Sequence, residues 1–197
     1  SNYPKPLPDN SVGSLMASNE GLYHFEGSAD DTSGNARNGT VSNAVQVTGK
    51  VGSNAYRFNR SATTYITLGG VTDYHFTTGN FTICGWFKPA ATQDSWAPLF
   101  SCLGNGGWGS NTRGYWVGQN NNIHNQYYIG IRHGTTYTAG TNFSLAANVW
   151  SHVAITKDGG TYKAYVNGTE VASDVMNATI NQTDNDSALI IGRNGLG

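Results

Sequence analysis

The sequence predicts an all-β protein built as an antiparallel two-sheet β-sandwich. Composition is the first reason: Val, Ile, Thr, Phe, Tyr and Trp together number 65 of the 197 residues, whereas Leu, Glu, Lys, Arg, Met and Gln number 30. The first group favours the pleated surface of a strand, and the second favours helices. Spacing is the second reason, because strand-like runs separated by turn signals recur about every 8–12 residues, as in sandwich folds.

The strands are expected to follow a polar, proline-bearing start. Residues 1–20 contain three prolines, which favour an extended backbone, so we expect a linker or stalk junction there. The weakly apolar stretch 11–18 within it could form a first strand. The sandwich itself is expected to span 21–197. Its first half is predicted to contain strands at 22–25, 55–58, 65–68, 81–88 and 99–103.

Two tight turns mark the second half of the chain. Asp158-Gly159-Gly160 is flanked by strand-like runs at 150–157 and 161–166, and glycine readily adopts the positive φ that a hairpin turn needs. Asn167-Gly168 gives a second turn of this kind. The remaining strands are expected at 115–117, 127–132, 135–138, 169–172 and 188–191.

Charge and hydropathy exclude two classes of partner. Charged residues make up 12% of the chain and the net charge is −1, so the basic excess of a nucleic-acid-binding protein is missing. No apolar run approaches the length of a membrane-spanning helix, and we expect no membrane insertion. A chain rich in Asn, Thr and Gly and poor in Lys and Glu is typical of surface and fibre proteins. The expected location is therefore extracellular, at a cell surface or on a virion.

Five segments in order resemble laminin G-like domains of the concanavalin A-like jelly-roll class. They are GLYHFEGSADDTSGNARNGTV from residue 21, GKVGSNAYRFNRSATTYITL from residue 49, FTICGWFKP from residue 81, WSHVAITKDGGTYKAYVNGTEVAS from residue 150 and LIIGRNG from residue 189. The resemblance covers residues 21–195. It implies a two-sheet jelly roll that binds glycans or proteins, often with a calcium ion.

The resemblance directs attention to the loop 30–39. Asp30 and Asp31 lie there among Ser, Thr, Gly and Asn residues, and calcium prefers several hard oxygen ligands from such an irregular loop. The same residues could instead only form Asx turns. Laminin G-like domains usually close with one more strand, which the sequence lacks. Apart from truncation, 11–18 or another subunit would take its place, since an unpaired edge promotes aggregation.

Glycan hydrolysis is not expected. Glycanases of the concanavalin A-like class carry paired carboxylates on one strand in a Glu-x-Asp-x-x-Glu pattern, and glycoside hydrolysis needs two carboxylates. The chain has three glutamates, Glu20, Glu26 and Glu170, and none belongs to that pattern. A Gly-x-Ser-x-Gly nucleophile motif is missing, and the five histidines show no metal-ligand spacing.

Sugar recognition is predicted for the region 94–128, which is rich in aromatic, Asn, Gly and Ser residues. Flat aromatic rings contact the apolar C–H faces of sugars, and Asn, Gln and Arg bind their hydroxyls. Trp108 lies in GNGGWGSN and serves either as a stacking platform or as a loop anchor. Tyr115 and Trp116 are expected to point to opposite faces of a strand. The candidate glycan contacts here are Asn105, Trp108, Arg113, Tyr115 and Asn121.

A second candidate patch is Arg132, His133 and Tyr137, where Arg132 could bind an acidic sugar; a solvated hairpin tip is the alternative. Trp86 and Trp150 match strands of the family core and are assigned to packing. Cys84 and Cys102 would form a disulfide if 81–88 and 99–103 pair, or would remain two buried thiols.

The sequence thus predicts a non-enzymatic, lectin-like module of a bacterial or phage adhesive fibre that binds a cell-surface glycan. A trimer built on the stalk would strengthen weak sites through avidity. Two alternatives are a protein-interaction or assembly module, and a glycoside hydrolase or its accessory domain.

Overall fold

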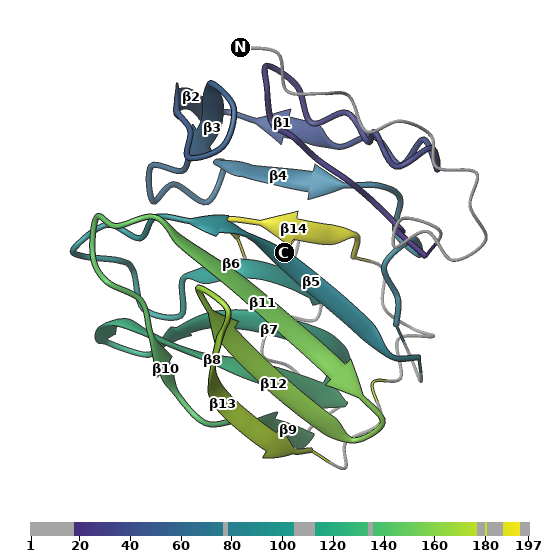
Figure 1. The fold of residues 1–197 in the computed structure, drawn as a ribbon, viewed down its shortest axis with the longest axis vertical. Coiled ribbons are helices and arrows are strands. Elements are labelled where there is room, and N and C mark those ends of the chain that lie inside the picture. Colours follow the sequence, from purple (N-terminus) through teal and green to yellow (C-terminus); the bar gives the residue numbers. More distant parts are fainter. Residues whose placement is uncertain are drawn as a thin grey trace.

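The computed structural model describes residues 18–76, 79–104, 113–133, 136–176, 180 and 187–193. The regular elements in this part of the chain are all β-strands, arranged as two stacked sheets and a separate hairpin (Figure 1). The prediction of an antiparallel β-sandwich is confirmed. No helix in the described residues is long and apolar enough to cross a membrane.

The larger sheet has eight strands in the described part of the chain, and they pair antiparallel throughout. In spatial order it contains β1 (Thr40–Ser42), β4 (Tyr65–Leu68), β14 (Leu189–Ile191), β6 (Pro98–Leu103), β7 (Arg113–Asn120), β8 (Ile123–His133) and β10 (Phe143–Ser144), with β9 (Thr136–Ala139) also paired to β8. The long hairpin β7–β8 lies toward one end of this sheet, between β6 and the short strands β9 and β10, and carries most of the residues discussed below.

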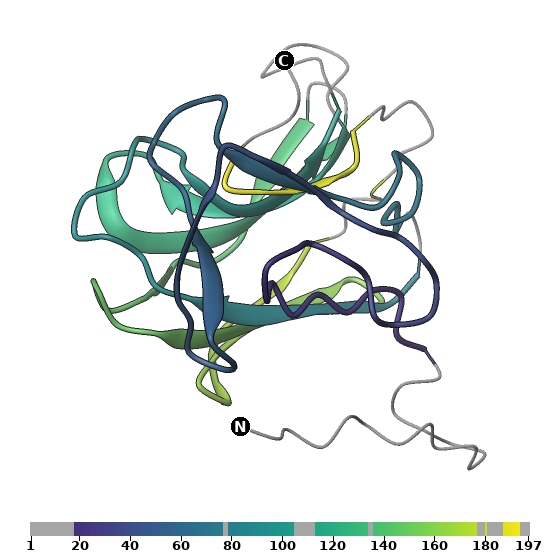
Figure 2. The ribbon, with the colours of Figure 1, turned by 90° about the horizontal axis from the view of Figure 1, so that it is seen from above.

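The smaller sheet packs in front of the larger one in Figure 1, and Figure 2 shows the two as separate layers. Its strands in spatial order are β13 (Thr169–Val175), β12 (Thr161–Val166), β11 (Ser151–Asp158) and β5 (Phe81–Phe87). A two-stranded hairpin, β2 (Val45–Thr48) and β3 (Asn54–Arg57), lies beside the sandwich. Among the described strands β5 pairs only with β11, so β5 is an edge strand.

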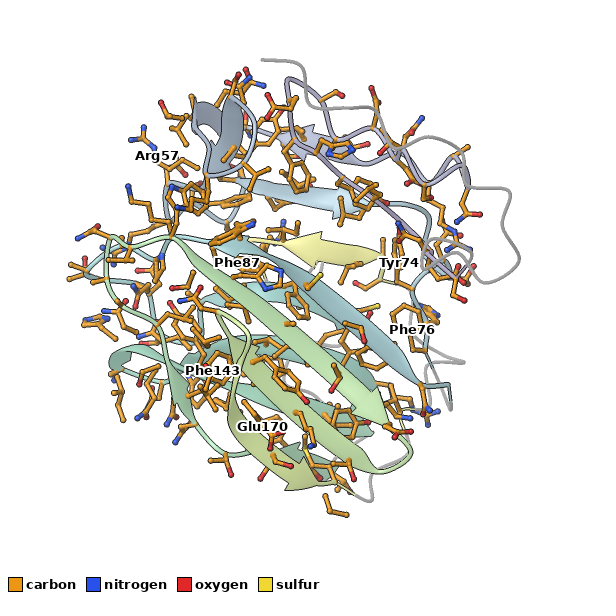
Figure 3. All side chains as sticks on the ribbon, in the orientation of Figure 1. Arg57, Tyr74, Phe76, Phe87, Phe143 and Glu170 are labelled. Atoms are coloured by element: carbon orange, nitrogen blue, oxygen red, sulfur yellow. The ribbon has the colours of Figure 1, made fainter. Side chains whose placement is uncertain are left out.

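The core fills the space between the two sheets because every central strand sends alternate side chains inward. The larger sheet contributes Tyr115, Val117 and Ile129, among others, and the smaller sheet contributes Val153 and Ile155. Aromatic residues at the margins of the same core include Tyr74, Phe76, Phe87 and Phe143, labelled in Figure 3.

Both predicted hairpin turns are confirmed. β11 and β12 pair from Asp158 opposite Thr161, with a two-residue Gly159-Gly160 turn between them. Val166 opposite Thr169 leaves Asn167-Gly168 as the turn between β12 and β13, and both turn residues have positive φ (51° and 84°). These turns were predictable because the backbone angle itself selects Gly and Asn.

Other local expectations need correction. The predicted strand at 22–25 is reduced to an isolated bridge between Tyr23 and Asp31. The strands predicted at 115–117 and 127–132 are longer than expected and form one hairpin, β7–β8, with its turn at residues 121–122. The possible first strand at 11–18 lies outside the described residues, except for Ser18.

The two cysteines are not paired. Both are free thiols; Cys84 is exposed and Cys102 is buried. A disulfide would require 81–88 to pair with 99–103, but β5 and β6 belong to different sheets, so the alternative of two free thiols holds, with only Cys102 buried. Cys102 points into the core, where its thiol approaches the backbone oxygen of Ser187 at 3.5 Å, while Cys84 lies on the outer face of β5.

This placement predicts selective thiol labelling. In the folded protein Ellman's reagent should modify one thiol per chain rapidly, because a thiol must be accessible to react. The second should react only after unfolding in guanidinium chloride. The variant Cys84→Ser should abolish the rapid phase. Rapid reaction of neither thiol, or of both, would contradict the assignment of β5 and β6 to separate sheets.

Candidate functional site

Aromatic side chains gather on the outer face of the larger sheet, away from the sandwich core. Leu103, Trp116 and Tyr128 pack together there, with Trp96 and Tyr137 against them; we call these five residues the outer aromatic cluster. Its cause is the two-residue period of β7 and β8. Because one face of each strand supplies the core, the residues between them must point outward.

Two glycines allow the indole of Trp116 to lie close to the sheet. A Cβ atom at Gly118 would overlap the six-membered ring of Trp116, and one at Gly130 would overlap its Nε1 edge. Gly130 is the register partner of Trp116 on β8. Any residue other than glycine at these two positions would therefore keep the Trp116 ring from lying against the backbone. Tyr128 meets it edge to face, with ring centroids 5.3 Å apart.

Tyr137 extends the outer aromatic cluster across β9. Its hydroxyl donates a hydrogen bond to the hydroxyl of Tyr128. Burial, together with this contact, raises the pKa of Tyr128 well above its usual value. Both phenols therefore stay neutral at physiological pH and can exchange hydrogen bonds with each other or with a ligand.

Trp96 reaches the cluster from the loop before β6, in a backbone conformation unusual for a bulky residue. Its φ is +63°, a region where non-glycine residues are uncommon and costly. The surrounding turn is held by the Ala97 amide, which donates to Asp94 O at 3.1 Å, and by the Gln119 amide, which donates to Ala97 O at 2.9 Å. Arg60 forms an ion pair with Asp94 on the same turn.

The accessible part of the cluster is its rim. Trp116 is 1% exposed and Tyr128 is 3% exposed, whereas Trp96 and Tyr137 are only half-buried. A ligand on this face would touch Trp96 and Tyr137 first. Trp116 and Tyr128 act beneath them as a rigid support.

The structure brings together four of the predicted site residues. Register places Arg113 opposite His133 and Arg132 opposite Tyr137, all at one end of β7, β8 and β9. The Arg132 side chain is 8% exposed. The side chain of His133 is outside the described part of the structure. Asn121 lies at the other end of the hairpin, about 25 Å away at the ordinary rise of a strand.

The prediction that Tyr115 contacts a glycan is wrong. Tyr115 is 2% exposed and lies in the core, where its hydroxyl donates to Tyr74 O at 3.0 Å and its ring meets Phe76 and Phe81. Its ring is not available to a ligand. The expectation that Tyr115 and Trp116 face opposite ways is confirmed. Asn105 and Trp108 lie outside the described residues, and their roles stay predictions.

Four residues of the outer aromatic cluster, Trp96, Leu103, Trp116 and Tyr128, come from the region 94–128, but none of them is among the predicted glycan contacts. Trp96, Trp116 and Tyr128 were visible in it as aromatics, and the available signal was alternation along 115–117 and 127–129. Trp86 was assigned to packing, and this is wrong: it is 40% exposed on the outer face of β5.

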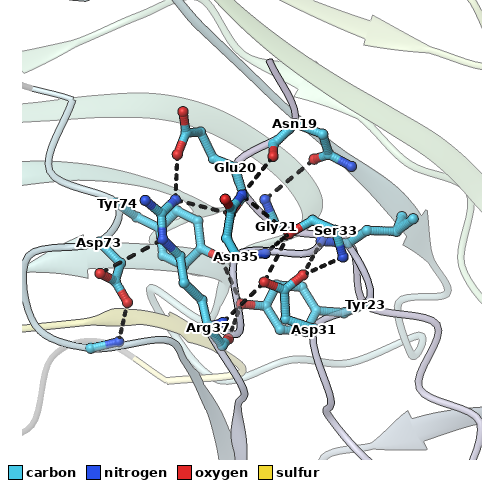
Figure 4. Close-up of polar contacts among 12 residues, drawn as sticks. Asn19, Glu20, Gly21, Tyr23, Asp31, Ser33, Asn35, Arg37, Asp73 and Tyr74 are labelled. Atoms are coloured by element: carbon cyan, nitrogen blue, oxygen red, sulfur yellow. Dashed lines mark hydrogen bonds and ion pairs between the residues drawn. The ribbon is translucent and has the colours of Figure 1, made fainter. Parts of the chain in front are cut away.

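The predicted calcium loop is organised around the Asp31 carboxylate (Figure 4). One oxygen accepts the amides of Leu22 (2.9 Å) and Ser33 (2.8 Å), and the other accepts the Ser33 hydroxyl (2.9 Å) and the Arg37 amide (3.0 Å). Burial alone would raise the pKa of Asp31, but these hydrogen bonds hold it below its usual value. Asp30 is exposed and accepts a hydrogen bond from Ser28.

This arrangement does not fit calcium at Asp31, because donors of the chain already occupy both carboxylate oxygens. Among the described residues, no three His, Cys, Asp or Glu are grouped so as to hold a metal ion. The loop instead connects neighbouring segments of the chain through hydrogen bonds. Tyr23 donates to Arg37 O at 2.6 Å, and its hydroxyl lies 2.6 Å from that of Tyr74.

Comparison with known proteins places this fold in a family. Residues 60–197 match the family model described as the concanavalin A-like lectin/glucanases superfamily. Because this match covers well over half of the chain, the chain belongs to that superfamily, and the laminin G-like resemblance is confirmed. A search of curated protein sequences found no match.

Solved structures show the same fold at low sequence identity. The binding domain of Paraclostridial Mosquitocidal Protein 1 is 19% identical with a TM-score of 0.67; the match covers 87% of this chain and 42% of that one. Domain 4 of the GH43 arabinanase AbnA from Geobacillus stearothermophilus, in complex with arabinotriose, is 18% identical with a TM-score of 0.64, covering 87% and 81%. A Trypanosoma rangeli sialidase mutant is 17% identical with a TM-score of 0.58, covering 85% and 26%.

The packing of Trp116 on bare backbone predicts that Gly130→Ala destabilises the protein by about 2 kcal/mol, the usual range for overpacking. The added methyl would displace the indole and crowd the Tyr137 hydroxyl, 2.9 Å from the new atom. Urea denaturation measures the change. The control is Gly79→Ala, where nothing lies within 4 Å of the new atom. Equal stability of both variants would show that Trp116 does not occupy this position.

The four hydrogen bonds that the Asp31 carboxylate accepts predict that replacing this residue lowers the stability of the fold, and that the loss depends on pH. Asp31→Ala should cost about 2 kcal/mol at pH 7, because several charge-assisted hydrogen bonds disappear. The folded pKa is depressed, so the contribution is complete above about pH 4, the unfolded value, and vanishes as the pH falls through the folded pKa. The two unfolding curves should therefore converge in acid. A difference in unfolding free energy between the wild type and Asp31→Ala that persists in acid would contradict this structural role of Asp31. So would a loss of stability on addition of EDTA in the wild type alone.

Proposed function

We propose that the chain is a non-catalytic carbohydrate-binding module whose ligand packs on Trp96 and Tyr137 at the rim of the outer aromatic cluster. The observation that carries the proposal is the position of these rings. The outer face of an antiparallel sheet is normally polar where it meets water. Here it holds aromatic rings that are only half-buried and are backed by a rigid support.

The chemistry of the cluster suits a sugar. Aromatic faces pack against the C–H faces of a pyranose or furanose ring, and neighbouring polar groups bind its hydroxyls. The Tyr137 hydroxyl can accept or donate, and its register partner Arg132 carries guanidinium donors on the same face of the sheet. The strained turn of Trp96 keeps its ring in place before the ligand arrives, which lowers the entropic cost of binding.

The placement of the carboxylates supports a role without catalysis. Every Asp and Glu in the described part of the chain accepts a hydrogen bond from another group of the protein. Glu170 and Asp174 share β13 but serve different contacts: Glu170 binds Lys163 at 2.8 Å, and Asp174 binds the Thr141 amide at 2.7 Å. Neither pairs with the other across a cleft, as the two carboxylates of a glycosidase do.

The comparisons support a sugar ligand. The superfamily takes its description from lectins and glucanases, and the arabinanase domain with this fold is in complex with arabinotriose. Under the same proposal the module serves adhesion outside the cell, as part of a bacterial or phage fibre. A trimer would multiply weak sites. Packing of the rim against another subunit is the assembly alternative.

A glycan array tests the proposal. The wild type should bind a defined set of neutral or acidic glycans. Trp96→Asn, which tolerates a positive φ, and Tyr137→Ala should each weaken binding at least about tenfold, as expected for a central aromatic contact. Val175→Ala, at an exposed position of the other sheet, is the control. Calcium and EDTA arms, with Trp108→Ala, test the remaining predicted contacts.

Silence of the wild type across the array would overturn the proposal. So would glycan binding that survives in both rim variants. Glycan hydrolysis that depends on one Asp or Glu would establish an enzyme instead. Burial of Trp96 and Tyr137 at a subunit contact would favour the assembly role.

A further inference from the structure

The outer face of the smaller sheet carries a large exposed aromatic side chain far from the outer aromatic cluster. Trp86 is 40% exposed, and the other large apolar side chains exposed in the described part of the chain are Val and Ile. β5 directs Phe81, Ile83 and Phe87 toward the core. Alternation therefore directs Trp86 outward, on the opposite side of the sandwich from Trp116.

Basic groups surround Trp86. The Lys50 ammonium, from the connection between β2 and β3, lies 5.5 Å from the centroid of the indole ring. His152, the register partner on β11, meets the indole edge to face with centroids 5.5 Å apart. Lys88 follows two residues after Trp86, is exposed, and by alternation lies on the same side.

This gathering is unusual in a chain with so few lysines. Of the four lysines in the described residues, Lys157 is buried and donates to Gly79 O, and Lys163 pairs with Glu170. The other two, Lys50 and Lys88, both flank Trp86, and neither forms an ion pair with a described carboxylate.

Glu26, from the segment before β1, is the acidic residue that contacts the adjacent β2–β3 hairpin, and its carboxylate is already engaged. It accepts the amides of Ser53 at 2.8 Å and Asn54 at 3.2 Å. Its charge therefore serves the backbone of the β2–β3 connection. The surface around Trp86 keeps a local positive charge although the whole chain carries −1.

We propose that Trp86, Lys50, Lys88 and His152 form a second binding site, which takes a saccharide bearing a carboxylate. The proposal rests on the carbohydrate-binding function but uses separate residues. The indole would contact the C–H face of the sugar, and the carboxylate would pair with Lys50 and Lys88. The long stem of Lys50 can turn its ammonium from the ring to the ligand without backbone movement. His152 offers a ring nitrogen to a hydroxyl.

A neutral sugar would leave both lysines without a counter-charge, so charge decides specificity at this site. Screening by salt should weaken such binding, because the lysines are on the surface.

Calorimetric titration at low salt with two acidic probes, trigalacturonic acid and sialyllactose, tests the proposal. The neutral controls are galactotriose and lactose. At least one acidic probe should bind and its neutral counterpart should not, and the probe that binds distinguishes a uronate from a sialate source. Trp86→Ala should weaken binding at least about tenfold, and Lys50→Ala should weaken it about fivefold and reduce its salt dependence.

Lys163→Ala, a lysine of the same sheet that is paired with Glu170, is the matched control and should bind like the wild type. Trp86→Phe should retain part of the affinity, which separates loss of a ring from loss of folding. Binding of neither acidic probe, or equal binding by Trp86→Ala, would overturn the second site. Acidic-probe binding that is lost in Tyr137→Ala but kept in Trp86→Ala would assign the ligand to the outer aromatic cluster instead, leaving the proposed function intact.

Discussion

The structure depends on the burial of both faces of the hairpin β7–β8. In most antiparallel sandwiches one face of a strand meets the core and the other meets water. Here Tyr115 and Val117 enter the core while Trp116, between them, is equally buried on the other side. Both faces of the strand therefore fix its register, since a shift by one residue would exchange the two sets. Gly130, opposite Trp116, and Gly118, two residues after it, leave room for the indole ring on this outer face.

The register of β7 and β8 sets the positions of the aromatic side chains on the outer face of the sheet. Because Trp116 and Tyr128 are buried and packed against the sheet, they support the rings of Trp96 and Tyr137, which contact them. The Asp31 network and the Arg37 contacts fasten the chain before β1 in the same way. Under the proposed function, such support would allow a few half-buried rings to bind a small ligand without a deep pocket. On the opposite sheet the exposed ring of Trp86 lies on an edge strand beside Lys50 and His152.

Local signals predicted much of the fold. The turns at Gly159-Gly160 and Asn167-Gly168 follow from backbone angles that few residues accept, so neighbouring strands could be located closely. Long-range pairing was another matter. Nothing local distinguishes a hairpin between 81–88 and 99–103 from a crossing between sheets, and this choice determines whether Cys84 and Cys102 can pair. Tyr115 and Trp116 show the same limit, because alternation predicts opposite faces but not which one is the core.

The most direct test of the carbohydrate-binding account is NMR mapping of the wild-type protein with a saturating glycan from the array. The indole N–H groups report each Trp separately. The account predicts that the indole signal of Trp96 and the backbone amides of β9 shift together, while the amides of the Asp30–Asp31 loop stay unchanged. Shifts confined to that loop, or to strands without an aromatic neighbour, would contradict the claim that the outer aromatic cluster forms the binding surface.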